Sequence, residues 1–248
     1  MADSDLPNPR ISIVIPFFDE EGAAPGLLAE LRPVVERLGT AEVLLIDDGS
    51  RDGTAGVLDE AAAAWPAVRV FHFAENHGQG AALFFGIQRA RGEVIALLDG
   101  DGQNDPADLA ALIAALDGAD YVTGIRANRR DSVLRRAMSR MANAVRSRVL
   151  RDGMRDTGCG LRVFRREVRE ALVPLRTLYS FIPAMARAAG FRIAELPVNH
   201  RPRTRGTSKY GLWVMLWRPL IDMLGVAWFI RRRSASPSRI ELREQAGK

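Results

Sequence analysis

A short apolar stretch followed at once by clustered carboxylates is the most constraining feature of this 248-residue sequence. Residues 94–98 read V-I-A-L-L, which predicts a buried strand of a parallel sheet. The sequence D-G-D-G-Q, beginning at Asp99, follows directly. Ligands of open α/β sheets bind beyond the carboxyl ends of the strands. The acidic cluster is therefore expected at a ligand-binding edge.

The spacing of these acidic residues predicts a divalent cation. Asp99 and Asp101 repel one another unless a cation neutralises them, and a hard ion held by one or two carboxylates and substrate phosphates would do so. An acidic turn that caps the helix beginning at Pro106 is the alternative, and it explains Asp105 only. A calcium-binding loop fits badly, because counting from Asp99 the sixth residue is not Gly and the twelfth is not Glu.

Strand and helix patterns alternate along the first half of the chain, which predicts an α/β fold with a mostly parallel sheet flanked by helices. The loops after the first, second and central strands then share one edge. Strands are expected at 11–15, 42–46, 68–73, 94–98 and 121–124, and helices up to about 38, at 54–64, up to 89 and at 106–116.

Two other loops at this edge carry polar groups or glycines. Asp47 and Asp48 can accept hydrogen bonds from a ribose or a base, whereas an ordinary Asx turn explains only the following D-G-T. Gly78 and Gly80 open a helix and would let backbone N–H groups approach a phosphate. An ordinary tight turn explains these glycines equally well.

Charge divides the chain into two unlike halves. Residues 1–125 hold 7 Lys/Arg against 21 Asp/Glu, and the remainder holds 28 against 9. The basic half is expected to face an anionic partner, which leaves nucleic acid, a membrane surface and a phosphorylated substrate open. The single cysteine, Cys159, excludes a disulfide framework and suits a reducing compartment. No signal peptide is visible in residues 1–9, which are expected to be flexible.

A basic amphipathic helix is predicted at 132–151. Leu134, Met138, Met141, Val145 and Val149 share one face, and the arginines lie largely elsewhere. Such a helix can lie on an anionic membrane. It can equally pack its apolar side on the sheet, which is the commoner arrangement for a single helix of this kind.

The segment 211–230 is strongly apolar and ends in three arginines. Arg218 and Asp222 lie within it, and Pro219 would break a helix there. We expect two short membrane-interfacial helices joined near Pro219 rather than one span, with a helix covering the sheet or a dimer contact as the alternative. The domain boundaries expected are 10–207 for the α/β domain, 208–233 for the interfacial segment and 234–248 for a disordered tail.

Four motifs in register carry a family resemblance: S-I-V-I-P-F-F-D-E-E, I-D-D-G-S-R-D-G-T, N-H-G-Q-G-A-A and L-L-D-G-D-G-Q-N-D-P. Together they resemble family 2 glycosyltransferases with the GT-A fold. Further on, D-T-G-C-G-L-R-V-F-R-R and H-R-P-R-T-R-G-T-S-K-Y-G resemble the branch of dolichyl- and polyprenyl-phosphate sugar synthases. The resemblance covers roughly residues 10–212.

The resemblance implies roles for individual residues. Asp99 and Asp101 would hold Mg²⁺ or Mn²⁺ on the donor's diphosphate, with Gln103 as a further contact. Binding of the nucleotide sugar is expected from Pro16, Phe18, Glu20, Ile46, Asp48, Gly78, Gly80, Asp99 and Gly100. Binding of donor or acceptor phosphates is expected from Arg126, Arg203, Arg205 and Lys209.

The expected reaction is inverting transfer of a hexose from a GDP- or UDP-sugar to a polyprenyl phosphate, by a peripheral enzyme at the cytoplasmic membrane face. An acceptor phosphate with a second pKa near ~6 is already largely ionised. The catalytic groups would then be Asp101 and Arg126, with Asp156 as the base if the acceptor were a saccharide hydroxyl.

The sequence leaves three alternative functions. The first is a family 2 transferase acting on a saccharide hydroxyl in cell-envelope polysaccharide synthesis, and the second is a nucleotidyltransferase. The third, a nucleic-acid binder, is disfavoured because the arginines are not interleaved with aromatic platforms. The partners expected are the donor, the lipid acceptor and a membrane surface, without nucleic acid, and a homo-oligomer stays open.

Overall fold

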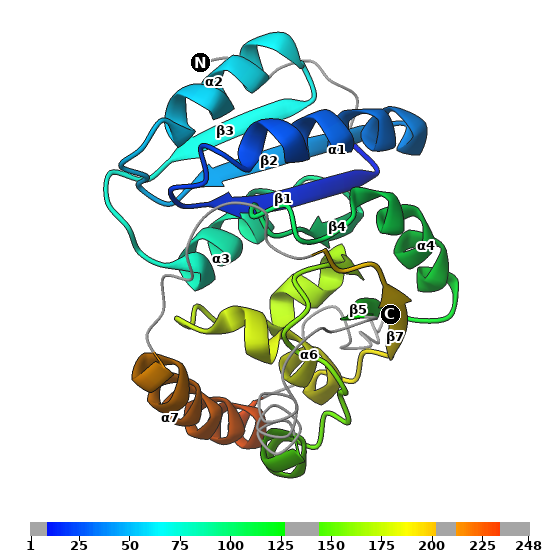
Figure 1. Ribbon diagram of the computed structural model, residues 1–248. Coiled ribbons are helices and arrows are strands. Elements are labelled where there is room, and N and C mark those ends of the chain that lie inside the picture. Colours follow the sequence, from blue (N-terminus) through cyan, green and yellow to red (C-terminus); the bar gives the residue numbers. More distant parts are fainter. Residues whose placement is uncertain (1–8, 127–143, 202–211, 234–248) are drawn as a thin grey trace, which may run out of the picture.

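One seven-stranded sheet organises the protein, in the order β3-β2-β1-β4-β6-β5-β7 (Figure 1). The structure is a computed structural model that describes residues 9–126, 144–201 and 212–233, with the side chains of the last segment described from residue 221 onward. The strands are β1 (Ile11–Phe17), β2 (Ala41–Asp47), β3 (Val68–His72), β4 (Val94–Leu97), β5 (Tyr121–Arg126), β6 (Arg162–Arg165) and β7 (Ile193–Val198).

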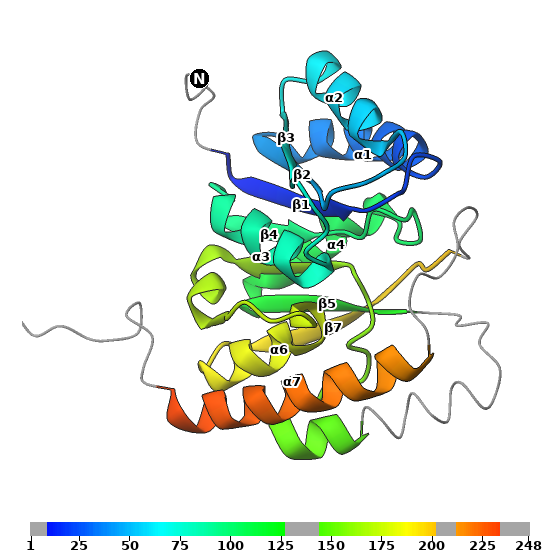
Figure 2. The same cartoon turned by 90° about the vertical axis from the view of Figure 1, so that its left-hand side faces the viewer.

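Helices cover both faces of the sheet (Figures 1 and 2). The hydrophobic cluster on one face includes residues of α1, α2 and α4, and the cluster on the other includes residues of α3, α6 and α7. The helices are α1 (Ala24–Leu38), α2 (Thr54–Ala64), α3 (Gln79–Arg89), α4 (Leu109–Ala114), α6 (Leu178–Ala188) and α7 (Leu212–Arg232), with 3₁₀ turns at Pro106–Asp108, Ala115–Asp117 and Arg166–Ala171.

The central strands are apolar on both sides because both faces are covered. In β1, Ile13 and Ile15 belong to the cluster with α1, and Val14 belongs to the cluster with α3. All three side chains are fully buried. A central parallel strand therefore reads as a continuous hydrophobic run instead of an alternating one.

Strand β6 is the only antiparallel strand among those described, and it runs against both β4 and β5. The strands β1 to β4, with β5 and β7, all point the same way. The reversal has a geometric consequence. The residues that precede β6, and not those that follow it, lie at the edge where the other strands end.

The predicted strand–helix alternation of the first half is confirmed, with the helix at 54–64 correct to the residue. The prediction of two short helices joined near Pro219 is wrong, because α7 continues through that position as one helix. A proline removes one backbone hydrogen bond from a helix interior. Downstream packing opposes this loss, since Met223 and Val226 are buried and Asp222 accepts hydrogen bonds from the N–H and hydroxyl of Thr177.

Within the described segments, none of the helices combines the length and the apolar character that a bilayer crossing requires. The predicted amphipathic helix at 132–151 lies partly outside the described residues, and 144–150 is helical. In that part the apolar side faces outward, since Val145 and Val149 are 49% and 38% exposed. Arg146 is buried instead and pairs with the fully buried Asp152. Packing of this apolar side on the sheet is therefore not observed.

Candidate active site

The loops that follow β1, β2 and β4 meet at one edge of the sheet, as the parallel arrangement requires. The segment that precedes β6 joins them there because β6 is reversed. Asp48, Asp99 and Asp156 are thereby brought to the same edge from three separate parts of the chain. This edge is the candidate active site.

The loops after β1 and β2 are held together by backbone-to-side-chain hydrogen bonds. The N–H of Asp19 donates to Ser50 Oγ (3.0 Å), and the N–H of Glu20 donates to Thr54 Oγ1 (2.8 Å). Asp19 has a φ of 49°, in the left-handed region. These contacts place Phe18 and Glu20, both half-buried, beside the second loop. Their predicted contact with the nucleoside stays a prediction.

Two residues predicted to surround the nucleoside have buried side chains. Pro16 and Ile46 are paired in the β1–β2 ladder. Ile46 is 0% exposed and packs in the cluster with α3, so its side chain cannot line a binding surface. Pro16 is buried as well. The predicted contact of these two residues with the nucleoside stays a prediction, and burial of both side chains leaves the backbone as the part that could make it.

Asp48 supports a neighbouring loop. Its carboxylate accepts hydrogen bonds from the N–H groups of His77 and Gly78 and from Asn76 Nδ2, each at 2.8 Å. Burial raises the pKa of Asp48, and the hydrogen bonds from His77 and Gly78 oppose that rise. The side chain therefore fixes the segment that opens α3. Its predicted contact with the nucleotide stays a prediction.

The two glycines of this segment have structural reasons of their own. Gly78 adopts a φ of 93°, where side chains are disfavoured, and its N–H donates to Asp48. A Cβ on Gly80 would lie 2.3 Å from the carbonyl oxygen of Leu175. Gly80 thus permits close packing of α3 on the loop before α6. The predicted role of both glycines in phosphate binding is untested.

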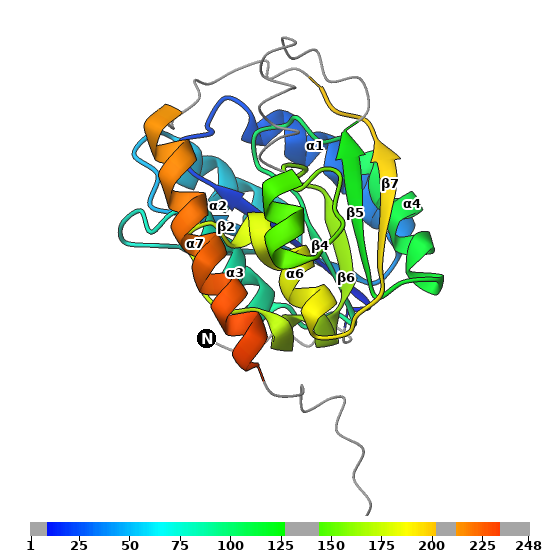
Figure 3. The same ribbon diagram turned by 90° about the horizontal axis from the view of Figure 1, so that it is seen from below.

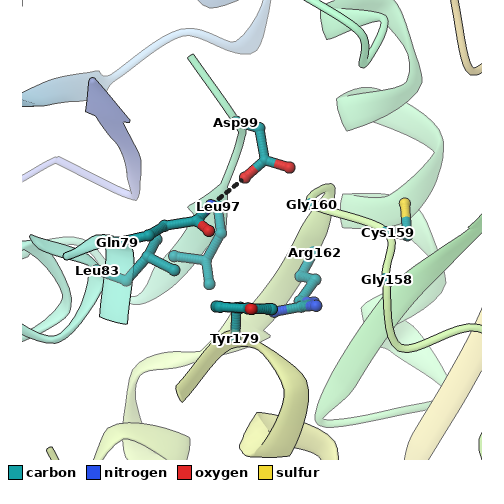
Figure 4. Close-up of a pocket in the computed structure, with 9 residues that line it drawn as sticks. All are labelled: Gln79, Leu83, Leu97, Asp99, Gly158, Cys159, Gly160, Arg162 and Tyr179. Carbon is teal, nitrogen blue, oxygen red and sulfur yellow. Dashed lines mark hydrogen bonds between the residues drawn. The ribbon is translucent and has the colours of Figure 1, made fainter. Parts of the chain in front are cut away.

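The carboxylate of Asp99 is closely surrounded by Gln79 and Gly160 (Figure 4). Gln79 Nε2, from the first residue of α3, donates to Asp99 Oδ1 at 2.8 Å. A Cβ on Gly160 would lie only 1.8 Å from Asp99 Oδ2, so this glycine makes the space for the carboxylate. Burial and the neighbouring Asp101 raise the pKa of Asp99 to about 6, against the opposing charges of Arg162 and Arg126.

Asp101 and Gln103 occupy the turn beyond Asp99. The N–H of Gln103 donates to Asp101 Oδ1 (3.1 Å), and its side-chain Nε2 donates to the carbonyl oxygen of Arg201 (3.3 Å). In return, the N–H of Arg201 donates to Gln103 O at 2.8 Å. The segment around 200 is thereby tied to the acidic turn.

The acidic turn fits a cation that shares its ligands with a substrate. Among the described residues, no three His, Cys, Asp or Glu side chains gather closely enough to hold a metal ion. Two neighbouring carboxylates, whose repulsion helps to raise the pKa of Asp99, are still a suitable donor set. Mg²⁺ is commonly bound by one or two carboxylates together with substrate phosphates. Asp99 and Asp101 match that chemistry.

Gly100, between the two acids, is buried. A Cβ there would lie 2.6 Å from the carbonyl oxygen of Pro16 and 2.7 Å from the ring of Phe17. Glycine is therefore required for packing of the acidic turn against β1. Its predicted contact with the nucleotide sugar is untested.

Arg126 and Asp156 form a two-pronged ion pair at the same edge. Arg126 Nε and Nη2 donate to the two carboxylate oxygens at 2.8 Å each, and the Arg126 N–H adds a third bond at 3.2 Å. Burial would raise the pKa of Asp156, but the hydrogen bonds and charge of Arg126 lower it overall. A carboxylate held in this way orients Arg126 well and is a weak base. The predicted base role stays untested.

Sequence reasoning missed four residues at this edge: Gln79, Gly158, Gly160 and Arg162. A Cβ on Gly158 would lie 2.5 Å from Arg126 Nη2, so the two glycines of D-T-G-C-G each make room for a charged side chain. The G-x-G spacing was the available signal. Arg162 is a charged residue in a strand and only 2% exposed, a burial that sequence pattern does not reveal.

The predicted phosphate-binding residues Arg203, Arg205 and Lys209 lie outside the described residues. The chain that leads to them is described as far as Arg201. His200 forms a bridge with Asn104, and Arg201 pairs with Asp105 at 2.9 Å. The start of the H-R-P-R-T-R segment is thus held against the acidic turn.

Comparison with known proteins agrees with this geometry. The model of the family described as glycosyl transferase family 2 matches residues 12–173. The chain is 40% identical over 218 residues to an undecaprenyl-phosphate 4-deoxy-4-formamido-L-arabinose transferase of Shewanella sediminis, covering 86% of this chain and 65% of that protein. It is 39% identical over 204 residues to the enzyme of that name from Pseudomonas fluorescens, covering 81% and 60%. The chain therefore spans less than two thirds of the length of these relatives.

Among solved structures, the chain resembles glucosyl-3-phosphoglycerate synthase of Mycobacterium tuberculosis in complex with Mn²⁺ and UDP-glucose. The TM-score is 0.69 at 18% identity, over 89% of this chain and 79% of that one. At this identity the likeness concerns the fold, which is GT-A. With the family model matching well over half of its length, the chain belongs to glycosyl transferase family 2.

Proposed function

We propose that this protein transfers a sugar from a nucleoside diphosphate sugar to undecaprenyl phosphate at the inner surface of a membrane, with inversion at the anomeric carbon. One observation supports this most. Arg201 ties the basic segment that follows it to the turn of Asp99 and Asp101, so cationic residues begin next to the acidic pair. We infer the acceptor from the relatives, which are named as undecaprenyl-phosphate sugar transferases.

Different residues at this edge would bind the donor and the acceptor. Asp99 and Asp101 would hold Mg²⁺ or Mn²⁺, which supplies positive charge to the departing diphosphate. Arg126, oriented by Asp156, and the cations after Arg201 hold the acceptor phosphate in line with the anomeric carbon. A phosphate is already ionised at neutral pH, so no group must remove its proton. The carboxylate of Asp156 already accepts hydrogen bonds from Arg126, which is consistent with a reaction that needs no general base.

The sugar is the open part of this proposal. The relatives are named for an arabinose derivative, which is a five-carbon sugar, whereas the sequence resemblance led us to expect a hexose. A donor panel should therefore contain both classes. Incubation with undecaprenyl phosphate and UDP- or GDP-linked pentoses and hexoses, followed by mass analysis of the lipid fraction, identifies the product.

The decisive result is a lipid-linked sugar that depends on added Mg²⁺ or Mn²⁺. Release of pyrophosphate from a nucleoside triphosphate would instead identify a nucleotidyltransferase. Transfer to a saccharide hydroxyl without any lipid product would support the second family 2 function. Either outcome would refute the proposal.

A membrane surface is the proposed site of action, because an undecaprenyl chain stays in the bilayer. The exposed apolar side chains Val145 and Val149, with Ile221, Leu224 and Trp228, lie on two helices at the end of the molecule that faces the viewer in Figure 3. The last three are 65–69% exposed. We name these five residues the apolar face. Exposed Arg231 and Arg232 close α7 and suit anionic lipid headgroups.

Sedimentation with vesicles tests this part. The variant Leu224→Ser/Trp228→Ser should lose most of its binding to vesicles rich in anionic lipid while unfolding at the same temperature as the wild type, since both side chains are exposed. A control is Ala63→Ser/Ala64→Ser, at two exposed positions of α2, far from α7 in Figure 1. Equal vesicle binding by the double variant and the wild type would exclude the apolar face as the docking surface.

A further inference from the structure

A cavity of about 100 Å³ adjoins Asp99 between α3, α6 and the start of β6 (Figure 4). Leu83 and Leu97 supply apolar walls, and Tyr179, near the beginning of α6, closes it from another side. The cavity is smaller than a nucleotide and borders the acidic pair. It is therefore sized for part of a ligand whose remainder lies at the edge of the sheet.

Arg162 lines this cavity, and its buried guanidinium is only partly satisfied. Its side chain is only 2% exposed, and Nη2 donates to the carbonyl oxygen of Thr157 at 2.9 Å. Its Nε has no hydrogen-bond partner among the described residues. Burying a charged group with so few partners is costly. A ligand that supplied a hydrogen-bond acceptor here would offset this cost.

The composition of the cavity wall distinguishes between ligand classes. A phosphate would meet the donor groups of Arg162 and Gln79 but would also meet the carboxylate of Asp99, which repels it. A sugar suits all of them, because its hydroxyl and amide groups both donate and accept while its C–H faces pack on Leu83, Leu97 and the ring of Tyr179. The sugar is also bonded directly to the diphosphate expected at Asp99 and Asp101.

We propose that the guanidinium of Arg162 donates a hydrogen bond to an oxygen-bearing substituent of the transferred sugar and, with Tyr179 as a second wall, determines which sugars the enzyme accepts. This inference rests on the proposed function, since it requires a nucleotide-sugar donor. Arg162 acts on specificity here and not on the diphosphate. A pocket that must satisfy a buried donor rejects analogues that lack the acceptor more strongly than an apolar pocket rejects a change in size.

Binding measurements test this without relying on transfer. Calorimetry with Mn²⁺ present gives the affinity of the wild type for the free nucleoside diphosphate and for UDP- and GDP-sugars that differ by one substituent. For Arg162→Met, the preference for the best sugar over its deoxy analogue should fall by roughly 10- to 100-fold, the value of one hydrogen bond to a charged group. The affinity for the free nucleoside diphosphate should stay within about twofold, because the hydrogen bond is made to the sugar alone.

Arg165→Met is the matched control, since Arg165 lies on the same strand but is exposed and outside the cavity. Tyr179→Ala provides a second variant that leaves the buried charge in place. This variant should bind sugars with bulkier substituents that the wild type binds weakly.

Three outcomes would overturn the inference. One is equal loss of affinity for every sugar and for the free nucleotide with Arg162→Met. Another is an unchanged preference in both Arg162→Met and Tyr179→Ala. The third is a wild type that binds nucleotide and nucleotide sugars equally. Sugar-selective binding that never leads to transfer onto undecaprenyl phosphate would refute the proposed function alone and leave this inference standing.

Discussion

The two halves of the site reach the same edge of the sheet by different routes. In the first half, Asp48 and Asp99 directly follow parallel strands, so their position is a consequence of strand direction. In the second half, Asp156 and Gly160 precede the antiparallel β6, and they reach the edge only because that strand is reversed. The acidic half carries the carboxylates that we propose as metal ligands, whereas the basic half makes room for Asp99 through Gly160 and orients Arg126 through Asp156.

The largest expected effect tests the ligand-supplying half. Asp101→Asn should lower transfer by roughly 10³-fold, because an amide is a poorer metal ligand and the diphosphate loses its counter-charge. The measurement is the initial rate at saturating donor over a series of Mn²⁺ concentrations.

Asp117→Asn, an exposed carboxylate at the end of the turn after α4, is the control and should keep the wild-type rate. If Asp101→Asn transferred sugar at the rate of this control, the assignment of the acidic pair would fail.

The next effect tests how the basic half makes room for the other acid of the pair, Asp99. Gly160→Ala would place a Cβ 1.8 Å from Asp99 Oδ2, so the carboxylate or the loop must move. We expect transfer to fall roughly 10²-fold, as for a small misplacement of a catalytic group.

Gly118→Ala is the matched control, since nothing lies within 4 Å of a Cβ there. Full activity of Gly160→Ala in a protein that unfolds like the wild type would show that the second half does not shape the acidic pair.

A third prediction concerns the ion pair of the basic half. Asp156→Asn removes the two-pronged ion pair between Arg126 and Asp156, and should lower the free energy of unfolding by about 3 kcal/mol. Transfer to a lipid phosphate should persist at a reduced rate, whereas transfer to a hydroxyl would need Asp156 as base. Complete loss of transfer, with binding of both substrates intact, would favour the hydroxyl mechanism.

The same pair carries a pH dependence. Arg126 lowers the pKa of Asp156 below its usual value, so the stabilisation is fully present above the unfolded-state pKa near 3.8 and is lost as the pH falls through the lower, folded-state pKa. The difference in unfolding free energy between wild type and Asp156→Asn should therefore be largest near pH 7 and should begin to shrink as the pH falls below the unfolded-state pKa towards pH 3. A constant difference across that range would contradict the pairing.

The smallest effect belongs to the edge strand of the acidic half. Burial alone would lower the pKa of His72, but its hydrogen bonds to Asp47 and Asp59 raise it overall above 6.5. The protonated ring therefore stabilises the fold below pH 6.5, and the gain disappears as the pH rises through the folded-state pKa. His72→Gln should differ most from the wild type near pH 5.5 and least near pH 9, in denaturant unfolding.

Pattern reasoning located the acidic pair and the order of strands and helices in the first half because both follow from local hydrophobic periodicity. It did not reveal that the side chains of Pro16 and Ile46 are buried in the ladder between β1 and β2. It also divided α7 at Pro219, since local propensity does not register the packing of Met223 and Val226.

The sequence by itself determined the family, the parallel α/β architecture and the acidic turn at the end of β4, because these depend on residues close together in the chain. Only the tertiary structure decided that Asp156 binds Arg126, that Gly160 makes room for Asp99 and that Arg162 is buried beside a cavity. The physical reason is that β6 pairs in the reverse direction between two strands from distant parts of the chain, and strand direction is a property of the assembled sheet.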